Sequence, residues 1–186
     1  MDHFVPVIPE FTFIYLVCYI FWIANYIMIA RQGKEYCMRF AMADMMSRVI
    51  CGFFFILIPT TNVRPELLGN GIWEQMLQGL YKADAATNLF PSIHCLVSWF
   101  CFIGIRGRKE VPKYYRVFSC IFAVLICVST QMIKQHYIVD VIGAIVIAEG
   151  TFYIGFHTKW YLLPEKIFDK ITAAFCKGYV CDEKRE

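Results

Sequence analysis

The sequence predicts an all-α fold, a polytopic membrane bundle of five transmembrane helices, from its composition and from the spacing of its apolar segments. Of the 186 residues, 59% are hydrophobic and 18% are charged, and the mean hydropathy is +0.52. One soluble core of this length cannot bury so much apolar surface, so most of it must face lipid. Five apolar segments have roughly the length needed to cross a bilayer, at residues 11–30, 40–59, 90–105, 117–135 and 137–157.

The segment 11–30 is expected to form the first transmembrane helix. It is longer than the apolar part of a signal peptide, and neither a basic region before it nor a clear small-residue cleavage site accompanies it. The rest of the chain shows no repeat, low-complexity tract or second domain. We therefore expect one membrane-embedded domain over residues 1–186.

Clusters of Lys and Arg between the segments predict the orientation, because positive residues beside a span are retained on the cytoplasmic side. The loop 31–39 holds Arg31, Lys34 and Arg39. The loop 106–116 holds Arg106, Arg108, Lys109, Lys113 and Arg116. Both loops are expected inside, which places the N-terminus outside and the tail 158–186 in the cytoplasm. Residues 60–89 and the short break near 136 then meet at the outer face.

The charges and cysteines argue against two other classes of protein. The net charge is only +3, and the basic residues stand beside apolar runs, so no nucleic-acid partner is expected. The nine cysteines fall in apolar runs or in segments assigned to the cytoplasm, so we expect free thiols: Cys18, Cys37, Cys51, Cys95, Cys101, Cys120, Cys127, Cys176 and Cys181.

Two further segments are amphipathic. After the turn at Gly69-Asn70-Gly71, apolar residues recur at helical spacing: Trp73, Met76, Leu77, Leu80 and Tyr81. This pattern predicts a helix in the outer interface, which either gates lipid entry or anchors the protein. In the tail, Pro164 precedes a second apolar face, formed by Ile167, Phe168, Ile171 and Phe175, which is expected to rest on the inner leaflet.

Ionisable residues at membrane depth are costly and are therefore candidates for function: Asp44, Arg48, His94, Lys134, His136, Asp140 and Glu149. Asp44 and Arg48 are four residues apart, so they are expected to form an ion pair on one helical face. Glu149 has no partner nearby in the sequence, and we expect it to bond to a neighbouring helix.

His136 and Asp140 are also four residues apart, at the outer start of the last span. At this spacing the carboxylate can hold one ring nitrogen of the imidazole and leave the other as a base, nucleophile or metal ligand. A buried histidine bonded to a helical neighbour is the alternative, and the pair alone does not decide between them.

The start of the third segment favours anion binding. Pro91 is expected in the first helical turn with Asn88 as a possible cap, so that backbone N–H groups, the Ser92 hydroxyl and His94 stand at one helix end. Arg64 follows the second segment and offers a forked guanidinium suited to phosphate. Together with His136, these groups are what an in-line attack on a phosphoester requires.

These residues resemble the three motifs of the type 2 phosphatidic acid phosphatase (PAP2) superfamily, which are Lys-x6-Arg-Pro, Pro-Ser-Gly-His, and Ser-Arg-x5-His-x3-Asp. The matching residues are Arg64 and Pro65, then Pro91, Ser92 and His94, then Ser129, His136 and Asp140. The order and the intervals of the motifs agree across residues 57–140. The resemblance implies that His136 forms a phosphohistidine, that Asp140 orients it, that His94 protonates the leaving group, and that Arg64, Ser92 and Ser129 lie at the phosphate.

The sequence departs from the motifs at three positions. Leu57 replaces the first Lys, Ile93 replaces Gly, and Thr130 replaces Arg. We expect Lys134, one helical turn beyond residue 130, to restore a cation, and Lys82 is a second candidate. The family usually has six membrane helices, so five imply a shortened core.

The resulting expectation is an integral membrane lipid phosphatase that hydrolyses a lipid phosphate monoester or diphosphate at the outer face, without metal or cofactor. The wording of the second and third motifs is also similar to inositol phosphorylceramide synthases, so transfer of a phosphorylated headgroup is the alternative. From other classes, a polar-lined transporter, a metal-binding pore with His94, His136 and Asp140 as ligands, and a structural membrane protein remain open.

Overall fold

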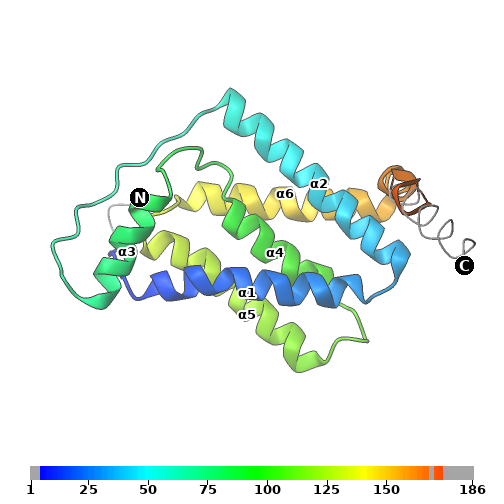
Figure 1. Cartoon of the computed structure of the whole chain (residues 1–186), viewed down its shortest axis with the longest axis horizontal. Coiled ribbons are helices and arrows are strands. Elements are labelled where there is room, and N and C mark those ends of the chain that lie inside the picture. The colour runs from blue at the N-terminus through cyan, green and yellow to red at the C-terminus, as the bar shows by residue number, and fades with distance from the viewer. Residues whose placement is uncertain (1–4, 168–169, 174–186) are drawn as a thin grey trace, which may run out of the picture.

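The computed structural model describes residues 5–167 and 170–173, which fold into helices joined by loops with one isolated β-bridge, between Thr61 and Thr87. The predicted all-α membrane bundle is confirmed. Figure 1 shows its named helices, α1 (Phe11–Ala30), α2 (Lys34–Leu57), α3 (Ile72–Ala83), α4 (Ile93–Ile105), α5 (Lys113–Met132) and α6 (Ile138–His157).

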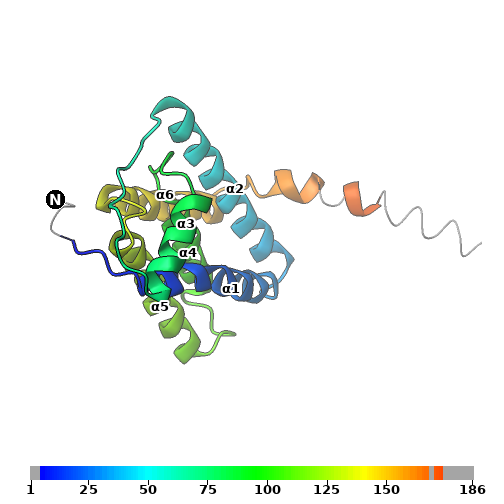
Figure 2. The same ribbon diagram turned by 60° about the vertical axis from the view of Figure 1, so that its left-hand side comes forward.

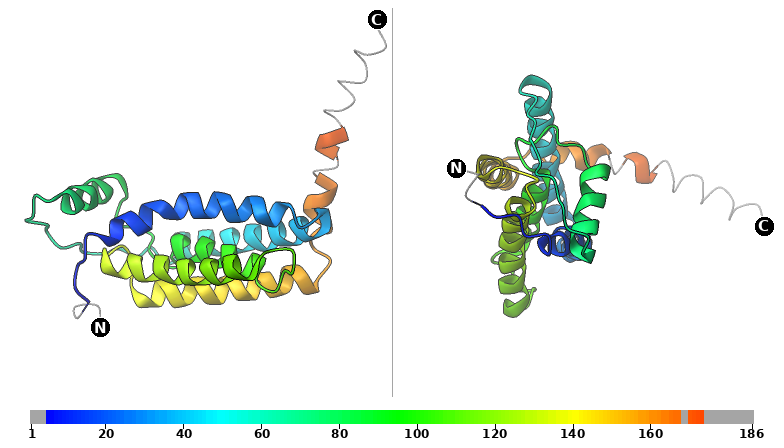
Figure 3. Two further views of the ribbon diagram at one scale, coloured as in Figure 1. Left: turned by 90° about the horizontal axis from the view of Figure 1, so that it is seen from below. Right: turned by 90° about the vertical axis from the view of Figure 1, so that its left-hand side faces the viewer.

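The third of the five predicted segments forms a helix that is shorter than a full span. Within the described ranges, α1, α2, α5 and α6 are long and apolar enough to cross a bilayer. The helix α4 has 13 residues, and a helix of that length spans about 20 Å of a hydrocarbon core about 30 Å thick. Its apolar composition reflects burial in protein, because Leu96, Phe100 and Ile103 are fully buried. Figure 3 shows α4 between α1 and α6.

The four long helices turn large apolar side chains outward. Ile20, Ile56 and Val146 are 69%, 79% and 64% exposed. A surface of this kind suits the acyl chains of a bilayer, so the fold is that of an integral membrane protein.

Helix ends differ from the predicted spans by a few residues. The helix α2 begins at Lys34 instead of residue 40, and α5 runs from Lys113 to Met132 instead of from 117 to 135. Both helices start earlier because an apolar run marks the part of a helix in hydrocarbon, whereas the helix itself continues through charged residues whose side chains reach the interface. The earlier end of α5 has another cause, since Lys134 has a left-handed φ of 53°.

Two predicted ion contacts are confirmed. Arg48 donates to Asp44 through Nε at 3.2 Å, within α2. Glu149 of α6 accepts two hydrogen bonds from Arg106, at 2.8 and 2.9 Å, and one from the indole of Trp99 at 3.0 Å. Arg106 follows the last residue of α4, so this carboxylate ties the short helix to α6.

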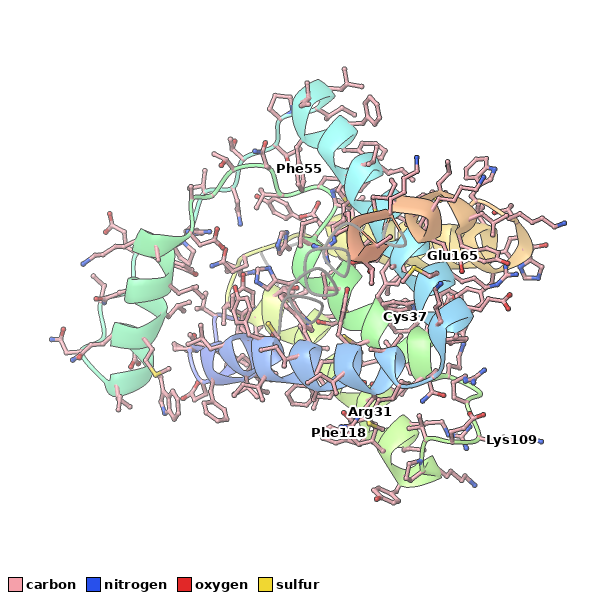
Figure 4. The ribbon with its side chains drawn as sticks, turned by 45° about the vertical axis from the view of Figure 1, so that its right-hand side comes forward. Arg31, Cys37, Phe55, Lys109, Phe118 and Glu165 are labelled. Carbon is pink, nitrogen blue, oxygen red and sulfur yellow. The ribbon has the colours of Figure 1, made fainter. Side chains whose placement is uncertain are left out.

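The end of the bundle that carries the basic loops is held by Arg39. Its guanidinium donates to the carbonyl oxygens of Phe156 and Thr158 at 3.1 Å, and so satisfies acceptors at the C-terminal end of α6. Figure 4 shows Glu165 of the tail beside the first turns of α2, where its carboxylate lies 3.3 Å from Lys34 Nζ. In the tail, Phe168 and Phe175 lie outside the described residues.

The predicted amphipathic helix is present as α3, but its apolar side faces protein rather than lipid. Leu77 is fully buried and packs with Tyr15 of α1 and with Ile133. Figure 1 shows α3 running across the end of the bundle where α1 begins, and Figure 2 shows α3 in front of that end. The helix therefore covers the bundle end that is opposite the basic loops.

The described cysteines are free, as predicted for Cys18, Cys37, Cys51, Cys95, Cys101, Cys120 and Cys127. Cys176 and Cys181 lie outside the described residues.

Candidate active site

A cavity of about 160 Å³ opens at the α3 end of the bundle. Its walls come from the last turns of α2, the loop after α3, the start of α4 and the turn between α5 and α6, through Phe55, Asp84, Ala85, Thr87, Asn88, Leu89, Ile93, His94, Gln135 and His136. Figure 4 labels Phe55 where α2 approaches the loop that precedes α4. The segment 60–89 and the break near residue 136 therefore lie side by side. Asn62 Nδ2 links them by donating a hydrogen bond to the Lys134 carbonyl at 2.9 Å.

His136 lies in the turn before α6, with one ring nitrogen engaged. Nδ1 is 3.0 Å from the Leu89 carbonyl oxygen and 3.5 Å from Asp140 Oδ2. Both neighbours accept hydrogen bonds, so the proton of a neutral ring belongs on Nδ1 and the lone pair on Nε2. The carboxylate of Asp140 also accepts from the Tyr137 backbone N–H at 2.8 Å, which fixes it at the first turn of α6.

His94 shares the cavity with His136, and their ring centroids are 6.4 Å apart. Two tyrosine hydroxyls of α1 contact the His94 ring: Tyr15 Oη at 3.0 Å from Nδ1 and Tyr19 Oη at 3.4 Å from Nε2. Tyr15 Oη also lies 3.4 Å from Asp84 Oδ2 and donates there. The structure thus places His94, His136 and Asp140 close together at this end of the bundle.

Ser92 does not line the cavity but is the N-cap residue of α4. Its hydroxyl caps α4 by accepting from the Cys95 N–H at 3.3 Å, and its own N–H donates to the Asp140 carbonyl at 3.2 Å. The expected cap at Asn88 and first-turn position of Pro91 are therefore wrong, because the helix begins at Ile93 with Ser92 as its N-cap.

Arg64 is close to the site, and both of its Nη groups donate to protein acceptors, whereas its buried Nε has no hydrogen-bond partner among the described residues. One Nη donates to the carbonyls of Tyr81 and Asp84, at 3.1 and 2.5 Å, and the other to Gln135 Oε1. The guanidinium also stacks over the Tyr81 ring. Burial raises the pKa of Tyr81 to about 12, against a smaller opposing effect of Arg64, so its hydroxyl stays neutral and donates to the Ile133 carbonyl at 2.7 Å.

Neither of the two lysines expected to replace the missing motif cations, Lys134 and Lys82, lines the cavity. Lys134 follows the end of α5, has a left-handed φ of 53°, and is outside the lining, so the expectation of one helical face shared with Thr130 is wrong. Lys82 lines a different hollow, together with residues of the loop before α3. Leu57, at the position of the motif lysine, is 74% exposed at the end of α2. Ser129 donates to the Ile126 carbonyl within α5 at 2.7 Å and is fully buried.

Several residues of the site were not predicted from the sequence. Tyr15, Tyr19, Asp84, Gln135 and the Leu89 carbonyl reach the cavity or its histidines only through the packing of distant segments. A signal for Asp84 was present, since it is the acidic residue nearest to the second motif in the loop that was assigned to the site.

In the part of the chain that the structure describes, no group of three or more His, Cys, Asp or Glu residues is arranged to hold a metal ion. His94, His136 and Asp140 thus do not form the three-ligand set that a metal-binding pore would need.

A family model described as the PAP2 superfamily matches residues 7–154. Neither the curated proteins nor the solved structures gave a match. The matched range includes every residue that lines the cavity and ends within α6.

Proposed function

The chain belongs to the PAP2 superfamily, and from that premise we propose that it is a membrane-embedded enzyme that cleaves the phosphoester of a lipid through a phosphohistidine at His136. The observation that carries the proposal is the pairing of His136, engaged through Nδ1 at 3.0 Å by the Leu89 carbonyl, with His94 across the same cavity. One ring has a free lone pair for attack, and the other is placed to handle a proton.

In the first step, Nε2 of His136 attacks phosphorus and forms a P–N bond. The bond between phosphorus and the leaving alcohol breaks, and protonated His94 gives its proton to the departing oxygen. Positive charge that develops on the His136 ring is stabilised by the Asp140 carboxylate, 3.5 Å from Nδ1. In the second step, water or an alcohol attacks phosphorus, its proton passes to His94, and the P–N bond breaks.

The acceptor in the second step distinguishes two candidate functions. Attack by water makes the protein a lipid phosphatase, and attack by an alcohol makes it a headgroup phosphotransferase. One observation supports the headgroup phosphotransferase: of the described residues that line the cavity, none is Lys or Arg. A dianionic monoester depends on such cations more than a diester does.

We place the cavity at the extracytoplasmic face. The support is the distribution of charge, because the basic loops with Arg31 and Lys109 lie at the opposite end of the bundle from α3, and such loops are retained in the cytoplasm (Figure 4). In intact cells, Val63→Cys should react with a membrane-impermeant maleimide, and Lys109→Cys should react only after the cells are opened. The reverse pattern would invert the proposed orientation.

The experiment that tests the function uses purified protein in detergent with radiolabelled lipid phosphates and measures free phosphate and transferred phosphate, with and without alcohol acceptors. Turnover should be lost in His136→Ala and kept in His157→Ala, a matched control because His157 bonds within α6 to Tyr153. Protein-bound label that is stable in alkali and lost in acid would identify the phosphohistidine. Equal turnover in both variants would leave His136 without a catalytic role.

A further inference from the structure

The charge of the cavity wall restricts the substrate. Asp84 lines the cavity, whereas Lys134 and Arg64 are outside its lining. The Nη groups of Arg64 donate to Tyr81, Asp84 and Gln135 and are thereby directed at the protein. Apart from the two histidines, the one charged residue of the described lining is Asp84, and Arg64, directly behind the wall, donates to the Asp84 backbone carbonyl and to Gln135 and not to the Asp84 carboxylate.

A phosphate monoester is a poor ligand for such a wall. At neutral pH it carries a charge of about −1.5 to −2, whereas a phosphodiester carries one negative charge. In a site with few water molecules, repulsion between like charges is stronger than in bulk water. Protonated His94 can balance the single negative charge of a diester, whereas no cationic side chain of the described residues donates to the Asp84 carboxylate.

Asp84 is held in place on three sides. Its backbone N–H donates to the Leu80 carbonyl at 2.9 Å, its carbonyl accepts from Arg64 at 2.5 Å, and Oδ2 accepts from the Tyr15 hydroxyl at 3.4 Å. A carboxylate has about four lone-pair positions, of which Tyr15 uses one. The remaining positions of a fixed carboxylate in a cavity wall are suited to a cationic group.

Resting on the proposed function, we propose that the substrate is a phosphodiester lipid whose headgroup carries an ammonium group, and that Asp84 binds this ammonium. His136 Nε2 then forms the bond to phosphorus, and the bond from phosphorus to the glycerol oxygen breaks. The proton of His94 passes to that oxygen and releases diacylglycerol. The phosphorylated headgroup stays on His136 until water or an alcohol takes it.

The test measures diacylglycerol release by purified protein from three lipids with the same acyl chains: phosphatidylethanolamine, phosphatidylglycerol and phosphatidic acid. The wild-type protein should cleave phosphatidylethanolamine about tenfold faster or more than phosphatidylglycerol, which has the same phosphodiester and no cation. Phosphatidic acid should be the slowest. Asp84→Asn keeps the shape and the contact with Tyr15, and it should lower the ratio of the first two rates by about tenfold.

Two further variants complete the test. Asp84→Glu retains the carboxylate and should keep the preference for phosphatidylethanolamine. Glu66→Gln is the matched control, because Glu66 lines a different hollow over the loop before α3, and it should leave the ratio unchanged.

Each other outcome contradicts the inference in a recognisable way. Equal rates for phosphatidylethanolamine and phosphatidylglycerol, or a faster rate for phosphatidic acid, would overturn the substrate class and leave the proposed function standing. If Asp84→Asn lowered the rates on all three lipids equally, Asp84 would act by positioning His94 through Tyr15 and would not bind the headgroup. Cleavage of all three lipids at an unchanged rate in His136→Ala would overturn the proposed function itself.

Discussion

Arg64 donates a 2.5 Å hydrogen bond to the backbone carbonyl of Asp84, the residue that caps the C-terminal end of α3. A cation at this position satisfies carbonyl groups that the helix leaves unpaired and interacts favourably with the helix dipole. The arginine of the first motif thus holds the loop that forms one wall of the cavity.

We predict that Arg64→Met lowers the free energy of unfolding by about 1–2 kcal/mol, because it removes a cap and leaves buried carbonyls unsatisfied. Thermal unfolding in detergent measures this loss, and Arg64→Lys should recover only part of it, since a lysine lacks the fork that reaches Gln135 as well. An unchanged unfolding midpoint together with a raised KM would instead make Arg64 a direct phosphate ligand.

Tyr15→Phe should reduce turnover by about tenfold or more, because removal of the hydroxyl leaves His94 Nδ1 without the oxygen that lies 3.0 Å away. The ring stays packed, so the unfolding midpoint should change little. Tyr114→Phe serves as the control, since Tyr114 is 77% exposed on α5. If both variants turn over at the wild-type rate, the hydroxyl has no part in placing His94.

Lys134→Met tests whether Lys134 replaces the missing motif cation, as the sequence predicts, or has no contact with the phosphate, as its position indicates. If Lys134 supplied the missing cation, its loss would reduce turnover sharply. Because Lys134 is outside the cavity lining, we expect turnover to fall by less than about threefold. This corresponds to a loss of at most roughly 0.7 kcal/mol of transition-state stabilisation. Steady-state rates on the best lipid substrate measure it, and a drop of about a hundredfold would restore Lys134 to the phosphate site.

Gly155→Ala should destabilise the bundle. A Cβ at this position of α6 would lie 2.9 Å from Ala43 Cβ and from the Arg39 carbonyl oxygen on α2, where backbone leaves no room. The expected cost is about 1–3 kcal/mol in thermal unfolding. Gly150→Ala, on the same helix, meets nothing within 4 Å and should be neutral or slightly stabilising. Similar midpoints for both variants would show that α2 and α6 can separate.

Hydropathy and spacing were sufficient for the helical fold and for part of the site. His136 and Asp140 could be paired from their four-residue interval, and Glu149 could be assigned to a neighbouring helix because a lone carboxylate at that depth needs a partner. These inferences rest on local geometry or on the cost of burying charge, and both are readable without coordinates.

The remaining features depend on packing that the sequence does not encode locally. A helix surrounded by protein is as apolar as one surrounded by lipid, so α4 could not be told from a span except by its length. Carbonyl groups at the end of α3 and phosphate oxygens attract the same guanidinium, so Arg64 could not be assigned. Lys134 was placed on a helix because the end of α5 at Met132 falls inside an apolar run.

The contact between α4 and α1 also sets the depth of the chemistry. The residues of α1 that touch His94, Tyr15 and Tyr19, are four and eight positions inside the start of that helix, about 6 and 12 Å along its axis. A phosphate that reaches His94 has therefore sunk below the level at which α1 begins. Under the proposed mechanism, water and a lipid alcohol would both have to reach His136 through the cavity at this depth, so access to the cavity would govern whether the intermediate is hydrolysed or passed to a lipid alcohol.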